Sequence, residues 1–270
     1  MKLSTLETGF FLSDGGAMFG LLPKMNWQRQ YPADNKNLCK MAMRCLLVET
    51  KNKIILLDTG IGTKNDPGIA GYGFFDIVDP TLSMQLLGIR PEEVTDVILS
   101  HLHFDHCGGI SYLNEKNELC ESYPNATYHI AESQWKHSLN PAPFDADSYF
   151  PQNTALLIGN PRLHLIRDTY ELTPDITLKI YNGHTPGQIV TFIEKQHETH
   201  LFAGDVIPTL PNLRIDSISA FDLHAETSFS EKNRLLHEAM EKNATLFFYH
   251  DAWHKSSRIC TTPLKKMRLY

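Results

Sequence analysis

Residues 101–109 read His-Leu-His-Phe-Asp-His-Cys-Gly-Gly, and this stretch decides the fold that we expect. The apolar run at 97–100 directly before it predicts a short buried strand. The pair of glycines at its end predicts a turn. The polar cluster therefore follows a strand at the point where the chain bends, which is where open α/β sheets place their chemistry.

The spacing of the polar residues in this stretch suits metal binding. His101 and His103 are two positions apart, so in extended backbone they share one face and can bind the same ion. Asp105 and His106 follow where the chain turns and can face a second point nearby. Four such groups are too many for one catalytic metal that keeps open positions, so the stretch predicts two metals.

Three later strand patterns also end in metal-binding side chains. They lie at 176–181, 200–203 and 245–249 and run into His184, Asp205 and His250. Because strands of one sheet bring their ends together, we expect all seven side chains to converge. We expect His101, His103 and His184 to hold one metal, Asp105, His106 and His250 to hold the other, and Asp205 to bridge them.

Other parts of the chain are predicted to surround this site. A strand at 53–58 ends in Asp58, which either bonds a metal-binding imidazole or closes the strand as an Asx turn. A loop at 17–23 carries Met18 and Phe19, which either line a pocket or subunit contact or pin the loop to the core. A glycine-rich loop at 60–75 carries Phe74 and Phe75 as further pocket candidates. The segment 140–153 is predicted to be a loop or broken helix, and a lid is one interpretation of it.

Regular elements elsewhere follow from hydrophobic periodicity. Further strands are predicted at 3–12, 45–49, 128–131 and 189–193, and a short helix at 81–87. The sequence Ser-Phe-Ser-Glu at 228–231 has the pattern of a capping box, so we expect a longer helix to begin there and to end near Asn243. His129 and His137 lie outside any motif and are interpreted as structural or surface residues.

Length and composition restrict the function classes. The 270 residues suit one domain spanning 1–270, with 42% hydrophobic and 21% charged residues. A net charge of −6 argues against nucleic acid as a partner. No apolar run is long enough to span a membrane, and the N-terminus lacks the pattern of a signal peptide. Five scattered cysteines form no disulfide framework, which indicates a reducing compartment, the cytoplasm. We interpret Cys107 as a small buried residue.

The order of these motifs resembles the metallo-β-lactamase superfamily. It runs His-x-His-x-Asp-His, then Gly-His-Thr-Pro-Gly, then Gly-Asp, then His. The resemblance implies an α/β fold of the four-layer αββα type, with two mixed sheets flanked by helices and the site at their edge. It also assigns the seven positions named above as metal ligands. Two metals would share a hydroxide that attacks an ester carbonyl, with Asp105 and Asp205 as catalytic residues.

Within the superfamily the chain is most similar to N-acyl homoserine lactone lactonases and to the methyl parathion hydrolase group. The similarity implies a small-molecule lactone or ester substrate and a homodimer. Zinc is the first expectation for the metals, and manganese, iron and cobalt are compatible with these ligands. One departure is Pro208, which stands where such lactonases carry a tyrosine three residues after the bridging aspartate. The alternatives are a phosphotriester or thioester hydrolase and a metal-binding protein without turnover.

Overall fold

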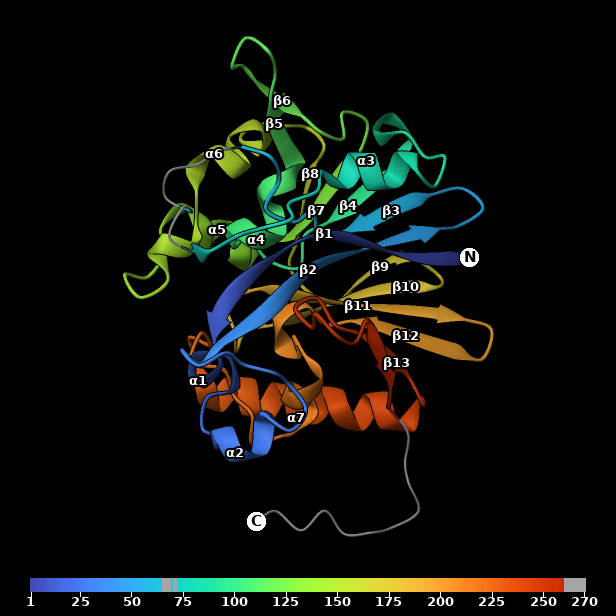
Figure 1. The fold of residues 1–270 in the computed structure, drawn as a ribbon. Helices are drawn as coiled ribbons and strands as arrows, with labels where there is room; N and C mark the ends of the chain where they lie inside the picture. Colours follow the sequence, from blue (N-terminus) through green and yellow to red (C-terminus); the bar gives the residue numbers. More distant parts are fainter. Residues whose placement is uncertain (65–68, 70–71, 260–270) are drawn as a thin grey trace.

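The computed structural model describes residues 1–64, 69 and 72–259 (Figure 1). Part of the predicted glycine-rich loop at 60–75 lies outside the described residues. Within the described part the chain forms two large sheets that face each other.

The first sheet has the strand order β1-β2-β3-β4-β7-β8. Its strands are β1 (Lys2–Asp14), β2 (Leu38–Glu49), β3 (Ile54–Leu57), β4 (Asp96–Ile98), β7 (Thr127–Ala131) and β8 (Leu163–Ile166). β1, β2 and β3 pair antiparallel, whereas β3, β4, β7 and β8 run parallel. The short central strands β3 and β4 are almost wholly apolar because both faces of a parallel sheet are covered.

The second sheet has the order β14-β13-β12-β11-β10-β9. Its strands are β9 (Tyr170–Thr173), β10 (Ile176–Tyr181), β11 (Gln188–Lys195), β12 (Glu198–Phe202), β13 (Thr245–Phe247) and β14 (Ser256–Arg258). Only β12 and β13 pair parallel among these described strands. A hairpin of β5 (Ser111–Leu113) and β6 (Leu119–Glu121) stands apart from both sheets.

Helices cover the outer faces of the two sheets (Figure 1). Above the first sheet lie α3 (Pro80–Gln85), α4 (Phe104–Cys107), α5 (Glu132–Leu139) and α6 (Pro151–Thr154). Below the second sheet lies α7 (Ala225–Glu241), and the short helices α1 (Gly15–Phe19) and α2 (Lys24–Trp27) lie near it. The predicted α/β fold of four layers is confirmed.

The main hydrophobic core fills the space between the two sheets. It joins buried side chains of the first sheet, such as Leu46 and Val97, with Ile189 and Phe202 of the second. Each large apolar side chain buried in this way stabilises the fold by about 1.5–3 kcal/mol. A second core lies between the second sheet and α7, where Leu235 is fully buried.

The start of α7 differs from its prediction. The helix begins at Ala225, so Ser228 lies inside its first turns and not at its cap. Its partner in the predicted capping box, Glu231, does not reach back to Ser228. Its Oε2 instead accepts the backbone N–H groups of Asn182 and Gly183, at 2.7 and 2.9 Å. A tertiary contact therefore replaces the local one that the pattern predicted.

An irregular loop is predicted at 17–23, but the first part of this segment is helical. It begins inside α1, because the carboxylate of Asp14 accepts the N–H of Ala17 at 2.9 Å and caps the helix. The rest of the segment joins α1 to α2 and packs against Cys39 and Met41 of β2 in the first sheet. A five-residue helix is too short to show a clear hydrophobic period.

A buried polar network lies at the start of β4, at the end of the strand away from residues 99–103. Asp96 is 2% exposed, and its carboxylate accepts hydrogen bonds from Lys53 Nζ at 2.7 Å and His129 Nε2 at 2.8 Å. Burial alone raises the pKa of Asp96, but the hydrogen bonds from His129, Lys53 and Thr95 outweigh it and lower the pKa to about 2. This network holds β3, β4 and β7 together.

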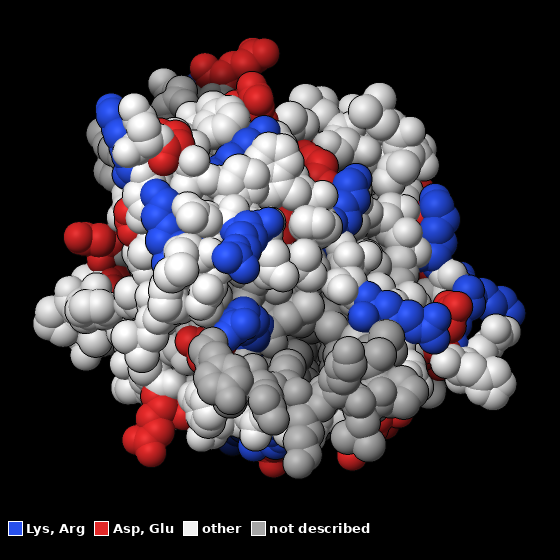
Figure 2. Space-filling model, turned by 60° about the horizontal axis from the view of Figure 1, so that its bottom comes forward, with Lys and Arg blue, Asp and Glu red and all other residues white. Residues whose placement is uncertain are grey.

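None of the helices in the described part of the chain is long and apolar enough to cross a membrane. On the face shown in Figure 2, the Lys and Arg side chains of the described residues are spread over the surface, and several of them lie beside Asp or Glu side chains.

Candidate metal centre

Four strand ends carry the seven predicted ligands to one place. β4 leads into His101 and His103. The short helix α4, which begins at the next residue, carries Asp105 and His106. The loops after β10, β12 and β13 present the other three, which are His184, Asp205 and His250. The expectation that strands of a single sheet supply them is wrong, because β4 belongs to the first sheet and the other three strands to the second. The site therefore lies at the edge that the two sheets share.

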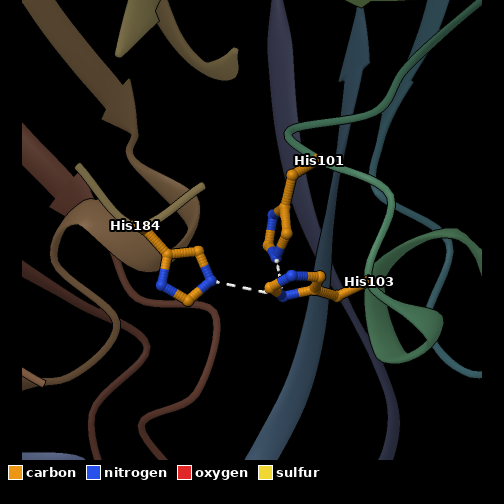
Figure 3. A group of neighbouring side chains, drawn as sticks. All are labelled: His101, His103 and His184. Carbon is orange, nitrogen blue, oxygen red and sulfur yellow. Dashed lines mark hydrogen bonds between the residues drawn. The ribbon is translucent and has the colours of Figure 1, made fainter. Parts of the chain in front are cut away.

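Three imidazoles form the first group, as Figure 3 shows. His103 Nδ1 lies 3.0 Å from His101 Nε2 and 3.3 Å from His184 Nε2. His101 and His103 come from one loop, and His184 approaches from the opposite side (Figure 3). The three rings point their nitrogens at a common centre, and all three residues are at least nine-tenths buried.

The second group contains Asp105, His106 and His250, whose ligand atoms lie within 4.8 Å of one another. The Nε2 atoms of His106 and His250 are 3.3 Å apart. Asp105 Oδ2 lies 3.8 Å from the first and 3.6 Å from the second.

Asp205 stands between the two groups. Its Oδ2 lies 4.0 Å from His101 Nε2 and 3.4 Å from His184 Nε2. Its Oδ1 lies 3.5 Å from His106 Nε2 and 3.2 Å from His250 Nε2. One oxygen therefore faces each group, which is the arrangement that a bridging carboxylate needs.

Asp58 supports histidines of both groups. Its Oδ2 accepts a hydrogen bond from His106 Nδ1 at 2.8 Å and from the hydroxyl of Ser100 at 2.7 Å. The proton of that hydroxyl goes to Asp58, so its oxygen is left to accept from His101 Nδ1 at 3.1 Å. Each imidazole is thereby held with its Nε2 lone pair turned toward the centre. The position of Asp58 matches the first of its two interpretations, in which its carboxylate bonds the imidazole of a predicted ligand.

The imidazoles of His184 and His250 are held in the same way, each by a hydrogen bond at its Nδ1. His184 Nδ1 bonds Asp222 Oδ1 at 2.9 Å, and His250 Nδ1 donates to the carbonyl of Ala42 at 2.8 Å. Asp222 was not predicted from the sequence. It belongs to the segment before α7, whose backbone also bonds the loop that carries His184.

Burial and mutual contact fix the protonation of these groups. Burial, followed by the neighbouring imidazoles, holds the pKa of His101 and His103 well below its usual range, so both are neutral. Burial would also lower the pKa of His106, but Asp205, Asp105 and Asp58 outweigh it and raise that pKa well above its usual range. These three carboxylates therefore favour the protonated, positively charged form of His106.

The donor set fits metal ions. Bonds of about 2.0–2.1 Å from zinc to nitrogen place two ligands of a tetrahedral ion roughly 3.3 Å apart, close to the 3.0–3.3 Å between these nitrogens. Asp205 Oδ1 is buried and has no hydrogen-bond partner, although an unpaired carboxylate oxygen is costly to bury. A cation between the side chains would satisfy it.

Two glycines allow the loop around α4 to pack tightly. A Cβ on Gly108 would lie 2.0 Å from the carbonyl oxygen of Ile61, and one on Gly109 would lie 2.2 Å from that of Thr59. Any larger residue would push α4, with Asp105 and His106, away from the strand end that holds Asp58.

A cavity of about 300 Å³ opens above the two groups. It reaches the centre through His103, Asp105, His184, Asp205 and His250, which all line it. Its apolar wall includes Phe11, Met18, Tyr72, Phe74, Phe104 and Phe221. The volume is at the lower end of the range for small-molecule sites.

The predicted pocket residues divide into two sets. Met18 and Phe74 line the cavity, whereas Phe19 and Phe75 do not. Phe19 is fully buried with its ring 4.8 Å from that of Trp27, and Phe75 stacks on Phe10 at 5.7 Å. In both cases a neighbouring aromatic residue covers the ring that we expected to face the cavity.

The predicted lid segment contributes directly to the cavity wall. Phe144, Asp145, Asp147 and Ser148 line it, and Pro208 lines it on the side of Asp205. Tyr149 lies behind His103 with its ring 5.0 Å from the imidazole, and its hydroxyl contacts Thr185 Oγ1 at 2.9 Å. Within the described residues the segment is a loop with two short helical turns, as expected.

Comparison with known proteins places this geometry in context. The sequence model of the Metallo-beta-lactamase superfamily matches residues 44–250. An N-acyl homoserine lactonase of Bacillus thuringiensis subsp. kurstaki is 24% identical over an alignment of 232 residues that covers 82% of this chain and 85% of the relative. One from a Bacillus species is 26% identical over an alignment of 227 residues that covers 79% of this chain and 83% of the relative.

Solved structures share the fold. A probable metal-dependent hydrolase from Staphylococcus aureus superposes with a TM-score of 0.87 at 24% identity, covering 96% of this chain and 94% of its own. The dizinc quorum-quenching lactonase AidC, bound to a product, superposes with a TM-score of 0.76 at 23% identity, covering 95% and 89%.

Proposed function

Because this chain belongs to the metallo-β-lactamase superfamily of metal-dependent hydrolases, we propose that it binds two divalent metals and hydrolyses a lactone or a related ester. The observation that carries the proposal is the position of Asp205, with one carboxylate oxygen facing each three-residue group at the floor of an apolar cavity. The N-acyl homoserine lactonases among its relatives support a lactone as the substrate.

The residues around the cavity have distinct roles in this proposal. His101, His103 and His184 would hold one metal, Asp105, His106 and His250 the other, and Asp205 both. Bound divalent metals supply Lewis acidity toward an ester carbonyl and lower the pKa of water toward about 7. Asp105 lines the cavity, so its carboxylate is placed to hold the proton that the leaving alcohol takes up. The aromatic wall excludes water and contacts the acyl chain.

Pro208 cannot donate the hydrogen bond that a tyrosine at its position would give to a substrate carbonyl. Among the described residues that line the cavity, four carry a hydroxyl group, namely Ser13, Tyr72, Ser148 and Ser219. Tyr72 is the one phenol among these lining residues, and its ring packs against Phe104 at 4.9 Å. A Tyr72→Phe variant would show whether that phenol takes the role, as a fall in kcat without loss of bound metal.

The direct test is turnover by protein loaded with two metals per chain, measured by elemental analysis. We expect hydrolysis of acyl homoserine lactones or of simple aryl esters. If two metals are bound and every lactone, ester and phosphotriester is left intact, a metal-binding protein without turnover replaces this proposal.

Phosphotriester hydrolysis is the second candidate. Among the described residues, no Lys or Arg lines the cavity, so an uncharged triester fits it better than a substrate with ionised phosphates. The same cavity disfavours thioesters whose leaving group carries phosphates. Turnover of a paraoxon-like triester at a higher kcat/KM than any lactone would favour this candidate.

We further propose zinc as the metal, since imidazole and carboxylate ligands suit it, with manganese, iron and cobalt as alternatives. We also propose that the protein acts in the cytoplasm. Its free thiols support this proposal, and those of Cys39, Cys45 and Cys107 are buried. The homodimer stays a prediction, which sedimentation of the loaded protein would test.

A further inference from the structure

We propose that the substrate carries a protonated amine, and that Asp145 and Asp147 bind it in the wall of the cavity. The inference rests on the proposed hydrolase function and specifies its substrate class. In the reaction, water cleaves the acyl–oxygen bond to give a carboxylate, an alcohol and one proton released to solvent, and the amine is unchanged.

Apart from the three histidines of the metal centre, the ionisable side chains that line the cavity in the described chain and carry full charge are all acidic. Four carboxylates line it, those of Asp105, Asp145, Asp147 and Asp205, and no Lys or Arg does. Two of the four belong to the candidate metal centre. The other two come from one short segment of the lid region and have no role in holding metal.

The carboxylates that belong to the metal centre already suffice to balance two divalent ions. Two divalent ions would meet the four carboxylates of Asp58, Asp105, Asp205 and Asp222. The carboxylates of the lid segment are therefore left over, and they give the loaded cavity an excess of negative charge. A cation of the substrate would reduce that excess.

Asp145 is the stronger of the two binding groups. It is 6% exposed, and its Oδ2 bonds His137 Nε2 at 2.9 Å. Its Oδ1 is buried and has no hydrogen-bond partner. A buried carboxylate oxygen without a partner is destabilising, so turning this carboxylate toward a donor on a ligand in the cavity would gain more than the same contact at an exposed carboxylate.

Asp147 adds a second negative charge from the same turn, which spans Ala146–Ser148. Its side chain is exposed and makes no hydrogen bond or ion pair within the described residues. The ring of Phe144, also in the wall, is 74% exposed and offers a face to a cation.

An organic cation fits this position better than a third metal ion. Asp145, Asp147 and His137 do not form one of the described groups whose ligand atoms all lie within 4.8 Å of one another. An ammonium group needs no such convergence, because it donates three separate hydrogen bonds.

The test compares two lactones that differ only in charge. N-(6-aminohexanoyl) homoserine lactone ends in an ammonium group, and N-heptanoyl homoserine lactone ends in a methyl group of similar size. For wild-type protein at pH 7.5 we expect kcat/KM to be about tenfold higher or more for the amine, since a hydrogen bond to a charged group is worth that much. In Asp145→Asn and Asp147→Asn the ratio of the two values should fall toward one.

A matched control carries the same change in charge away from the cavity. Asp175 lies exposed in the turn between β9 and β10, so Asp175→Asn should keep the wild-type ratio. A ratio near one in the wild type, or an amine preference that survives in the Asp145→Asn/Asp147→Asn double variant, would overturn the inference.

A binding measurement separates this inference from the hydrolase proposal. Calorimetry with hexylammonium and with 1-hexanol reports the charge preference of the metal-loaded protein without any turnover. Tighter binding of hexylammonium, lost in the double variant, would support the inference even if neither lactone is hydrolysed. Equal affinity for the two probes would refute it even if both lactones are hydrolysed.

Discussion

Replacing Asp222 by alanine should weaken one metal and spare the other. Asp222 is 7% exposed at its side chain, which within the described residues bonds Nδ1 of His184 at 2.9 Å. His184 belongs to the group with His101 and His103 and faces only Oδ2 of Asp205. Loss of Asp222 frees the ring to rotate and removes the charge that makes its Nε2 a stronger ligand.

The size of the effect follows from similar contacts in metalloproteins. Removing a carboxylate that orients a metal-binding imidazole costs about 10–100-fold in metal affinity, or roughly 1.4–2.7 kcal/mol. We expect the second metal, held by the group around His106, to lose much less affinity, because Asp222 bonds none of its three ligands and reaches it only through Asp205, which both metals would share. Chelator competition should therefore show one weakened binding step out of two.

Two further variants make the test specific. Asp58→Asn should weaken both steps, because Asp58 bonds His106 directly and His101 through Ser100. Asparagine tolerates the positive φ of 57° at this position, so the backbone need not change. Asp216→Ala removes an exposed ion pair in the same segment as Asp222 and should change neither step.

Nuclear magnetic resonance of ¹⁵N-labelled histidine would identify which imidazoles lose metal first. The reasoning is refuted if Asp222→Ala releases both metals equally, or if the His184 signals keep their metal-bound positions while those of His106 shift.

Three other predictions concern catalysis, local geometry and pH. His103→Ala or Asp205→Asn should lower turnover by orders of magnitude with little effect on expression, and unchanged activity in both would mean that the site is misplaced. Glu231→Ala leaves two backbone N–H groups before His184 without an acceptor, so chemical unfolding should show a loss of about 1–3 kcal/mol, whereas the exposed Glu226→Ala in the same helix should show none. Asp96, with its pKa lowered to about 2 from 3.8, stabilises the fold at pH above about 4, and that contribution is lost as the pH falls toward 2. Asp96→Asn should therefore cost about 2 kcal/mol at pH 7 and much less near pH 2, and an equal cost at both would contradict the assignment.

The elements that were predicted correctly are those whose sequence signals lie within or directly beside the element. The strand at 176–181 matches β10 residue for residue, because its alternating apolar and polar residues are bounded by turn residues on both sides. The ligand positions were also readable locally, since each stands directly after a strand. The structure brings all seven together, and whether they bind metal stays a prediction for the metal analyses above.

The failures share a different cause, which is contact between distant parts of the chain. Asp222 and His184 are 38 residues apart, and Glu231 and Gly183 are 48 apart. No period or motif relates such pairs. The apparent capping box at Ser228 failed for the same reason, since the contact of Glu231 with the loop of His184 replaces the local bond. Phe19 and Phe75 show that the sequence does not reveal whether an aromatic ring will face the cavity or be covered by a neighbouring ring.

The division of the ligands between the sheets has a consequence for how the site can form. The first sheet supplies two members of each three-residue group, and the second sheet supplies the third member of each and Asp205. Neither sheet alone holds a complete group, so each metal would tie the two layers together at their shared edge. Affinity for metal therefore depends on how the two layers pack, and substitutions deep in the core between them, far from any ligand, can change it. That dependence explains why local patterns located the ligands while the geometry that relates them required the whole fold.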